Sequence, residues 1–284
     1  MNPVNLSSAQ KWENATLANK FLFYKIFTHN PDMCKHLLEI LLHVEIEKIT
    51  PPQGEETFDV DFEAHGIRLD VYVKNETEAY DLEMQTVDTK ELPKRARYYQ
   101  GLMDVDNLKK GEPYDRLPKS YVIFLCLEDI FGKEMPVYSF QNICAEKSDL
   151  KLGDETYKIF FNAQKYDKML SEEERDFFKY LTGAAVKSDF TDKLDKLVSE
   201  AKHNAQWRHQ FMTWEQEVQI SYRNGVDDGK KQGIEQGIKR GTEQTKIETA
   251  KNLLKMKIGT VEQIAQATAI TIEDVLKLQK ELAV

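Results

Sequence analysis

The sequence predicts an α/β core followed by an all-α C-terminal tail. Apolar and polar residues alternate on both sides of a short polar turn in residues 68–85, as in a β-hairpin. Residues 121–127 form a continuous apolar run, which suits a central strand covered on both faces. A chain of 284 residues is long enough for a core of about 150–200 residues and an additional module.

Hydrophobic periodicity and turn residues give the order of the core elements. The predicted elements are a helix over 9–27, a helix from Pro31 to about Val44, the hairpin over 58–86, a helix over 89–109, the strand 121–127, a strand pair over 137–146 and 155–163, and a helix that starts at a capping box in Ser171-Glu172-Glu173-Glu174. This order describes an α/β core that ends near residue 185.

The hairpin is predicted to bring two carboxylates face to face. With a loop centred between Glu76 and Thr77, the facing pairs are Asp70–Glu83, Arg68–Gln85 and Tyr72–Asp81, while Leu69, Val71, Val73, Leu82 and Met84 share the other face. Directly opposed side chains have Cβ atoms roughly 4.5–5.5 Å apart, so both carboxylates can hold one cation, which also relieves their repulsion. The alternative is a solvated hairpin face on which two acidic residues fall opposite each other by chance.

The residues around this pair match a known pattern. Asp70, followed after the turn by Glu83-Met84-Gln85, resembles the core motif of the PD-(D/E)XK nuclease superfamily. In particular it resembles the Rpn family of recombination-promoting nucleases and transposases, in which the last motif is commonly Glu-x-Gln. The segments 66–73 before the turn, 94–100 after the hairpin and 19–27 near the start fit the same family.

The resemblance implies a restriction-endonuclease-like core, with a mixed central sheet flanked by helices, and a metal-dependent DNA endonuclease activity linked to recombination or phage defence. Asp70, Glu83 and the carbonyl of Met84 would then ligate Mg²⁺ or Mn²⁺, and the metal would polarise the phosphate and lower the pKa of an attacking water. Gln85 would orient that water, but a neutral amide neither takes its proton nor adds positive charge to the transition state.

One position departs from the family. The family usually has Asp directly after the asparagine that is Asn19 here, and this chain has Lys20. This departure favours, slightly, a second hypothesis, in which the protein is a catalytically weak or inactive member that acts as an oligomerising interaction protein through its tail. The intact Asp70, Glu83 and Gln85 argue against such decay.

The charge distribution restricts where DNA can bind. A net charge of −9 argues against a general nucleic-acid coat, whose affinity comes from Lys and Arg contacts to phosphates. A local basic lining is predicted from Lys90, Lys94, Arg95 and Arg97, with Tyr98 or Gln100 as further substrate contacts. On a helix that begins near Thr89, Lys90, Lys94 and Arg97 recur at i, i+4 and i+7 as one stripe. The stripe is either a phosphate-binding wall beside the carboxylates or an ordinary solvated face.

Cysteine, histidine and hydropathy patterns predict little further chemistry. The three cysteines, Cys34, Cys126 and Cys144, have no close spacing that would indicate disulfides or zinc, and are expected to be free thiols. His29, His36 and His43 recur every seven residues but do not converge as metal ligands would. No leader or transmembrane run is evident, so we expect no membrane partner and a cytoplasmic location.

The C-terminal part repeats glycine every fourth residue, at Gly225, Gly229, Gly233, Gly237 and Gly241. Each Gly weakens a helix by about 1 kcal/mol relative to Ala, so the repeat indicates close helix–helix approach between two copies, hence a homo-oligomer, or else a flexible or partly helical linker. Predicted helices over 247–256, 261–268 and 272–282 follow, with Thr260 and Thr271 as N-caps. They resemble a helix-turn-helix unit, but Glu273 and Asp274 at the start of its second helix favour protein contact over DNA.

The predicted division of the chain is therefore a nuclease-like domain over 1–185, a helical connector over 186–224, a glycine-repeat spacer over 225–245 and a small helical module over 246–284.

Overall fold

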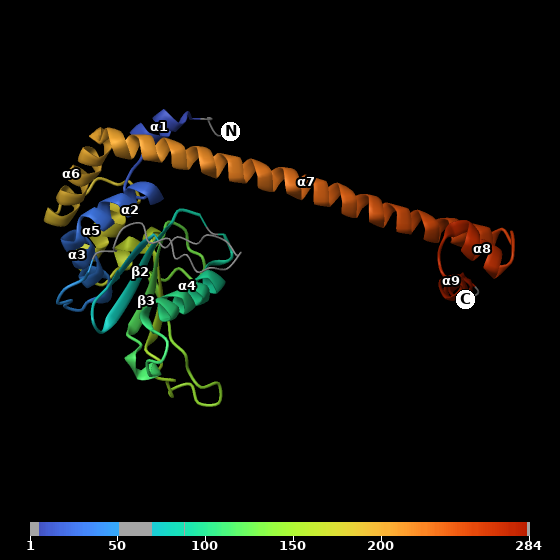
Figure 1. Cartoon of the computed structure of the whole chain (residues 1–284), viewed down its shortest axis with the longest axis horizontal. Helices are drawn as coiled ribbons and strands as arrows, with labels where there is room; N and C mark the ends of the chain where they lie inside the picture. Colours follow the sequence, from blue (N-terminus) through green and yellow to red (C-terminus); the bar gives the residue numbers. More distant parts are fainter. Residues whose placement is uncertain (1–5, 51–69, 88, 283–284) are drawn as a thin grey trace. The chain divides into compact units, whose positions relative to one another are not determined.

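The computed structural model describes residues 6–50, 70–87 and 89–282, and it divides into two compact units, residues 1–212 and 213–284. Its elements are α1 (Ser8–Glu13), α2 (Lys20–His29), α3 (Pro31–Leu42), β1 (Val71–Lys74), β2 (Glu78–Gln85), α4 (Leu92–Asn107), η1 (Tyr114–Arg116), β3 (Lys119–Cys126), β4 (Val137–Phe140), β5 (Thr156–Asn162), η2 (Ala163–Lys168), α5 (Glu172–Leu181), α6 (Asp189–His203), α7 (Ala205–Lys255), α8 (Val261–Thr268) and α9 (Ile272–Leu282) (Figure 1).

The described strands form one mixed sheet in the order β1-β2-β3-β5-β4. β1 and β2 pair antiparallel as a hairpin, β2, β3 and β5 run parallel, and β4 pairs antiparallel with β5. The α4 helix connects the parallel neighbours β2 and β3, as a crossover between parallel strands must. The mixed sheet, the central place of β3 and the pairing of β4 with β5 confirm the predicted α/β core.

The predicted hairpin register is confirmed. Val71 pairs with Leu82 and Tyr72 with Asp81, and the amide of Asn75 donates to the carbonyl of Glu78, which closes the turn at 2.9 Å. The pairing predicted for Arg68 lies outside the described residues. The expectation of a hairpin strand buried on one face was wrong for β2, whose residues from Ala79 to Gln85 are all buried, because helices cover both faces of the sheet.

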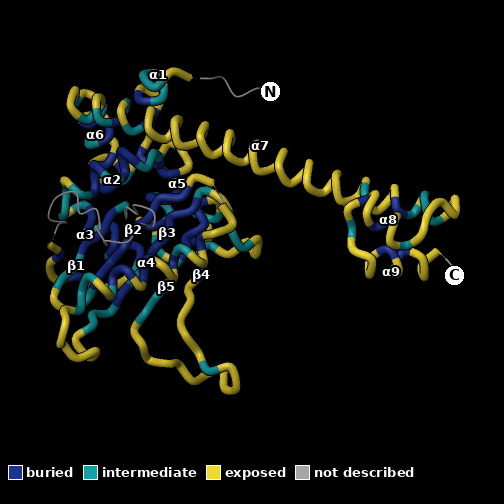
Figure 2. The backbone as a smooth tube through the Cα atoms, turned by 45° about the vertical axis from the view of Figure 1, so that its right-hand side comes forward, coloured by how far each residue is buried: buried dark blue, intermediate teal, exposed yellow. Residues whose placement is uncertain are grey.

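Helices cover both faces of the sheet (Figures 1 and 2). On one face α4 packs its Leu92, Ala96, Tyr99 and Met103 onto Phe124 and neighbouring apolar residues. On the other face Phe178 of α5 stacks on Phe161 of β5, and α2 packs near the hairpin. Side chains on successive strand positions alternate between these two layers.

The helix predicted over 9–27 was wrong as a single element. The chain forms α1 and α2 with a break between them, and the side chain of Asn19 accepts hydrogen bonds from the amides of Phe21 and Leu22 at 3.1 and 3.2 Å. An asparagine in this role is a strong helix start signal. The break therefore sets Lys20 as the first residue of α2.

The first unit extends through α6 and the start of α7. Trp12 of α1 is fully buried, and its indole N–H donates to the carbonyl of Lys202 at 3.2 Å. Its ring lies 5.1 Å from that of Phe211 and 6.1 Å from that of Phe21. These contacts fix α6 and the start of α7 to the N-terminal helices. The boundary at residue 185 stays a prediction, as do the other sequence-based divisions.

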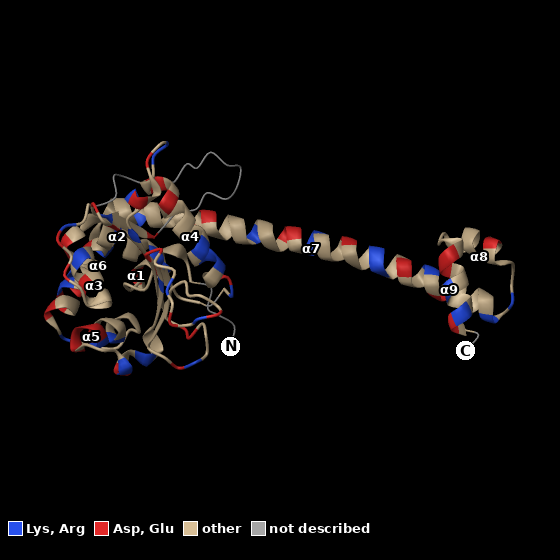
Figure 3. Ribbon diagram, turned by 90° about the horizontal axis from the view of Figure 1, so that it is seen from below, with Lys and Arg blue, Asp and Glu red and all other residues tan. Residues whose placement is uncertain are grey.

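The second unit consists of the remainder of α7, with α8 and α9 packed around Ala250, Ile264 and Val275. The helix predicted over 247–256 is the last part of α7 and not a separate element. α8 and α9 have their predicted bounds, and Thr260 and Thr271 accept from the amides of Gln263 and Asp274 as N-caps. The repeated glycines lie within α7, along which acidic and basic residues alternate (Figure 3).

Candidate active site

Three polar side chains alternate along the second half of β2 and are buried under α4. Asp81, Glu83 and Gln85 are 0%, 1% and 3% exposed. They share this face because the strand period is two, and they are buried because α4 and β3 close over it. Buried carboxyl groups of this kind are rare unless they are paired or functional.

Asp70 and Glu83 hold each other through the backbone. The amide of Asp70 donates to Glu83 Oε1 at 3.0 Å, and the amide of Met84 donates to Asp70 Oδ2 at 3.0 Å. The two acids are thus opposite one another, as the register predicted. Both carboxylates lie at the carboxyl end of β2.

Arg95 extends from α4, which covers this face of the sheet, and contacts Glu83. Its Nη2 lies 3.0 Å from Glu83 Oε2, and its Nε and Nη2 donate to the hydroxyl of Tyr99 at 3.1 and 2.7 Å. Its guanidinium also lies over the rings of Tyr99 and Phe124. Arg95 is therefore the basic residue of α4 that contacts the acids.

Gln85 and Lys20 complete the cluster. The orientation of a glutamine amide is assigned from its hydrogen bonds. In the orientation that matches its neighbours best, the Gln85 oxygen accepts from Lys20 Nζ at 3.3 Å and from Arg95 Nη2 at 3.2 Å. In the reverse orientation, the amide nitrogen donates to Glu83 Oε2 and the oxygen accepts from Arg95 Nη1, both at 3.3 Å.

Burial shifts the proton affinity of both buried acids. It raises the pKa of Glu83 to about 8, with a further increase from Asp70, while the Asp70 amide, Arg95 and Lys20 oppose the shift. Burial, Glu83 and Asp70 also raise the pKa of Asp81 well above its usual value. Neither side-chain oxygen of Asp81 has a hydrogen-bond partner among the described residues. Burial thus favours the protonated form of both acids in the metal-free protein.

The comparisons with known proteins agree with this geometry. The family model described as PD-(D/E)XK nuclease family transposase matches residues 17–226. The chain belongs to this family. No curated protein and no solved structure gives a significant match. The predicted resemblance and fold are confirmed, and the family description gives the protein a nuclease- or transposase-type function.

The donor set fits the divalent metal that PD-(D/E)XK nucleases generally use. Asp70 and Glu83 offer hard carboxylate oxygens, and a cation would stabilise the ionised form of Glu83, whose pKa is raised by burial first and by Asp70 second. In the part of the chain that the structure describes, no group of three or more His, Cys, Asp and Glu side chains is placed to hold a metal. A metal here would therefore draw on two carboxylates, the predicted carbonyl of Met84 and water.

The predicted DNA-contacting residues do not form the single stripe that the sequence indicated. α4 begins at Leu92, so Lys90 precedes the helix, in a left-handed backbone conformation with φ of 62°. Lys94, Arg97 and Tyr98 are exposed on α4. Gln100 is buried and donates to the hydroxyl of Ser120, which places it inside the core.

The histidines serve helix contacts. His36 Nε2 lies 2.7 Å from Glu173 Oε1, and His43 Nε2 lies 3.5 Å from Glu174 Oε2. His29 Nδ1 contacts the carbonyl of Lys25 at 2.9 Å. Cys34, Cys126 and Cys144 form no disulfide in the part of the chain that the structure describes, and Cys34 and Cys126 are buried.

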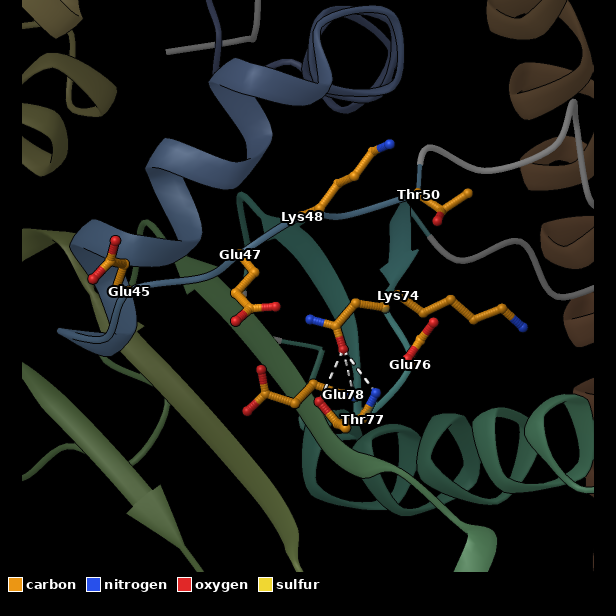
Figure 4. Close-up of a pocket in the computed structure, with 9 residues that line it drawn as sticks. Glu45, Glu47, Lys48, Thr50, Lys74, Glu76, Thr77 and Glu78 are labelled. Carbon is orange, nitrogen blue, oxygen red and sulfur yellow. Dashed lines mark hydrogen bonds between the residues drawn. The ribbon is translucent and has the colours of Figure 1, made fainter.

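A polar cavity lies at the other end of the hairpin (Figure 4). It is lined by Glu45, Glu47, Lys48, Thr50, Lys74, Asn75, Glu76, Thr77 and Glu78. Asn75 caps its own turn by accepting from the amides of Thr77 and Glu78. This cavity is at the start of β2, whereas the carboxylates lie at its end, so it belongs to the turn and not to the candidate active site.

Among the described residues, no helix combines the length and the apolar character needed to cross a membrane.

Asp81 and Lys20 belong to this cluster but were not predicted as site residues, although each has a recognisable feature in the sequence. Asp81 shares the alternation of Glu83 and Gln85, but its burial depends on α4 and β3, which are distant in sequence. Lys20 stood out only as a departure from the family. Its position after the N-cap Asn19 fixes it at the start of α2, within reach of Gln85.

Proposed function

We propose that this protein is a metal-dependent DNA endonuclease that hydrolyses phosphodiester bonds. The observation that carries the proposal is the Asp70–Glu83 pair, in which each acid accepts from a backbone amide at 3.0 Å, beside Gln85 at the end of β2. Family membership supports a nuclease, and the paired carboxylates support its metal dependence.

Asp70, Glu83 and the carbonyl of Met84 would hold Mg²⁺ or Mn²⁺. When bound, such an ion polarises the scissile phosphate and lowers the pKa of a water nucleophile. The hairpin positions both carboxylates through backbone amides, so the rearrangement needed for binding would be confined to Arg95, which pairs with Glu83 Oε2. Gln85, on the same face, would orient the water by hydrogen bonding.

DNA would approach over α4. Lys94, Arg97 and Tyr98 are exposed there, and Lys90 precedes the helix. A local basic surface of this kind binds phosphates despite the net charge of −9. Gln100 is left out of this surface, since its side chain is buried. We place this activity in the cytoplasm, in recombination or in defence against phage, on the basis of the family resemblance alone.

The test is cleavage of supercoiled plasmid by the full chain with Mg²⁺ or Mn²⁺. Asp70→Ala and Glu83→Ala should each reduce nicking by more than the roughly 10–100-fold that loss of an outer-shell partner costs a metal site, and EDTA should abolish it. Glu47→Ala, a change of an exposed acid near the turn, is the matched control and should leave cleavage unchanged. Cleavage that survives both site substitutions, or none by the wild type, would refute the proposal.

A second candidate function is assembly by a catalytically weak or inactive member. Two observations favour it. First, Glu83 is already paired with Arg95 at 3.0 Å, which occupies one oxygen of the carboxylate. Second, the side chains of Ile234 and Ile238, next to the repeated glycines of α7, are 64% and 65% exposed. A side chain added at those glycines would meet nothing within 4 Å, so the helix face can accept a close partner. A homo-oligomer through α7 is compatible with either function, and metal binding by calorimetry separates the two.

A further inference from the structure

Lys20 lies at the start of α2, where a positive charge is electrostatically unfavourable. It is the first residue of α2, directly after the N-cap Asn19, and the first turn of this helix contains no acidic residue. The start of a helix carries a positive partial charge and favours acidic side chains. A lysine at this point therefore needs negative partners outside the helix.

Those partners belong to the candidate active site. Lys20 Nζ lies 3.3 Å from the oxygen of the Gln85 amide in its favoured orientation, and it lowers the pKa of Glu83 through its charge. Gln85 is 3% exposed, whereas Lys20 is half-buried. The ammonium group thus lies where the buried end of β2 meets solvent.

Lys20 and Arg95 have different environments within this cluster. Arg95 is engaged by the Glu83 carboxylate and by two bonds to the Tyr99 hydroxyl. Lys20 contacts a neutral amide, and an ammonium group has three donors. After its bond to Gln85, Lys20 retains donors for an anionic ligand, while the planar Arg95 is held by the protein.

We propose that Lys20 is a catalytic residue that binds a non-bridging oxygen of the scissile phosphate, and so supplies the positive charge that Gln85 lacks. This inference rests on the proposed endonuclease function. The Gln85 amide aims the ammonium group, and the charge acts on the phosphate as negative charge accumulates in the transition state. Lys20, which stands where the family usually has Asp, is then part of the active site of this protein.

The experiment compares Lys20→Met and Lys20→Arg with Lys193→Met in the full chain. Lys193 lies exposed on α6 and is a matched control for the loss of one surface charge. The first readout is the binding of an end-labelled short DNA duplex in EDTA over a series of salt concentrations. The second is the single-turnover rate of cleavage in Mg²⁺.

For Lys20→Met we expect weaker duplex binding, with the slope of log K against log salt smaller by about 1, and a single-turnover rate lower by roughly 100-fold. Lys20→Arg should restore the salt slope and part of the rate. Lys193→Met should match the wild type in both. A salt slope and rate for Lys20→Met equal to those of Lys193→Met would overturn the proposal. So would a rate loss that Lys20→Arg does not restore at all, since position 20 would then act by its shape.

Failure of this inference is distinct from failure of the proposed function. If the wild type cleaves in an Asp70-dependent way and Lys20→Met behaves as Lys193→Met, only the role of Lys20 is overturned. If the wild type itself does not cleave, the endonuclease proposal is refuted, and with it the catalytic role of Lys20. A Lys20-dependent salt slope would then identify a phosphate-binding residue without catalysis.

Discussion

Replacing Glu83 by Gln should stabilise the metal-free protein relative to the wild type increasingly as the pH rises. Burial first, and then Asp70, raise the pKa of Glu83 from 4.5 to about 8 in the folded protein. Between these two values the folded state binds more protons than the unfolded state, so its stability falls as the pH rises. Glutamine has a similar shape and cannot ionise. Its single amide oxygen can replace only one of the two carboxylate oxygens that accept from the Asp70 amide and from Arg95, and the cost of the lost bond does not depend on pH in the way that the ionisation of Glu83 does.

The magnitude follows from the same shift. At 1.36 kcal/mol for each pKa unit, a rise from 4.5 to about 8 corresponds to an upper limit on the order of 5 kcal/mol. Glu83 is 1% exposed, so solvent screening reduces this little. The pKa of Asp81 shifts in the same direction mainly through its own burial, which both proteins share. The smaller part that comes from Glu83 is lost in Glu83→Gln and adds to the difference.

The assay is urea unfolding in EDTA from pH 5 to pH 9, followed by the fluorescence of tryptophan, since Trp12 is buried in the first unit. The free energy of unfolding of Glu83→Gln minus that of the wild type should rise by several kcal/mol over this range. Glu47→Gln, at an exposed position, should show a difference that does not depend on pH. A flat difference for Glu83→Gln would mean that the charge of Glu83 is already compensated, and the argument from burial would be refuted.

Three further predictions concern other parts of the chain. Trp12→Ala should lower the free energy of unfolding by about 3–5 kcal/mol in a urea titration followed by circular dichroism, because it removes a fully buried ring that packs on Phe211; a loss below about 1 kcal/mol would contradict this packing. Ala269→Gly should stabilise α8 and α9 by about 1 kcal/mol, seen as slower hydrogen exchange, because Ala269 has a left-handed φ of 51°; unchanged or faster exchange would count against it. Gly233→Ala with Gly237→Ala should reduce the mass measured by light scattering to that of a single chain, because the added methyl groups block close approach of a second α7; an unchanged mass would exclude these glycines from the interface.

The hairpin shows how far local sequence patterns reach. The period-two alternation and the turn residues were sufficient to predict that Val71 faces Leu82 and that Asp70 lies across from Glu83. The register of the hairpin is set by its own hydrophobic pattern and turn, because a slip of one residue in the strand pairing would turn every apolar side chain to the opposite face. The same pattern did not predict how deeply the hairpin is buried. The face of β2 that carries Asp81, Glu83 and Gln85 is covered by α4 and is not solvated.

The basic residues of α4 show the limit more sharply. Periodicity alone placed Lys90, Lys94 and Arg97 on one stripe, but the helix starts after Lys90, and it is Arg95 that contacts Glu83. Helix ends depend on a few backbone hydrogen bonds and are poorly fixed by composition. Arg95 was among the predicted basic residues but not on the predicted stripe, and the pattern did not indicate which of these residues meets the carboxylates.

The charges within the site are linked through Glu83. Its Oε1 accepts from the amide of Asp70 and its Oε2 pairs with Arg95, so a metal held by this carboxylate competes with Arg95 for the same group. A buried ion pair offsets the cost of removing its charges from water only while both partners remain together. Arg95 therefore stabilises Glu83 in the metal-free protein, and a cation bound by this carboxylate would have to compete with Arg95 for Oε2, while Arg95 would keep its bonds to the Tyr99 hydroxyl. The pair that favours a catalytically weak member is thus also compatible with a metal-binding site, in which Glu83 would exchange Arg95 for the cation, and metal binding by the full chain decides between the two.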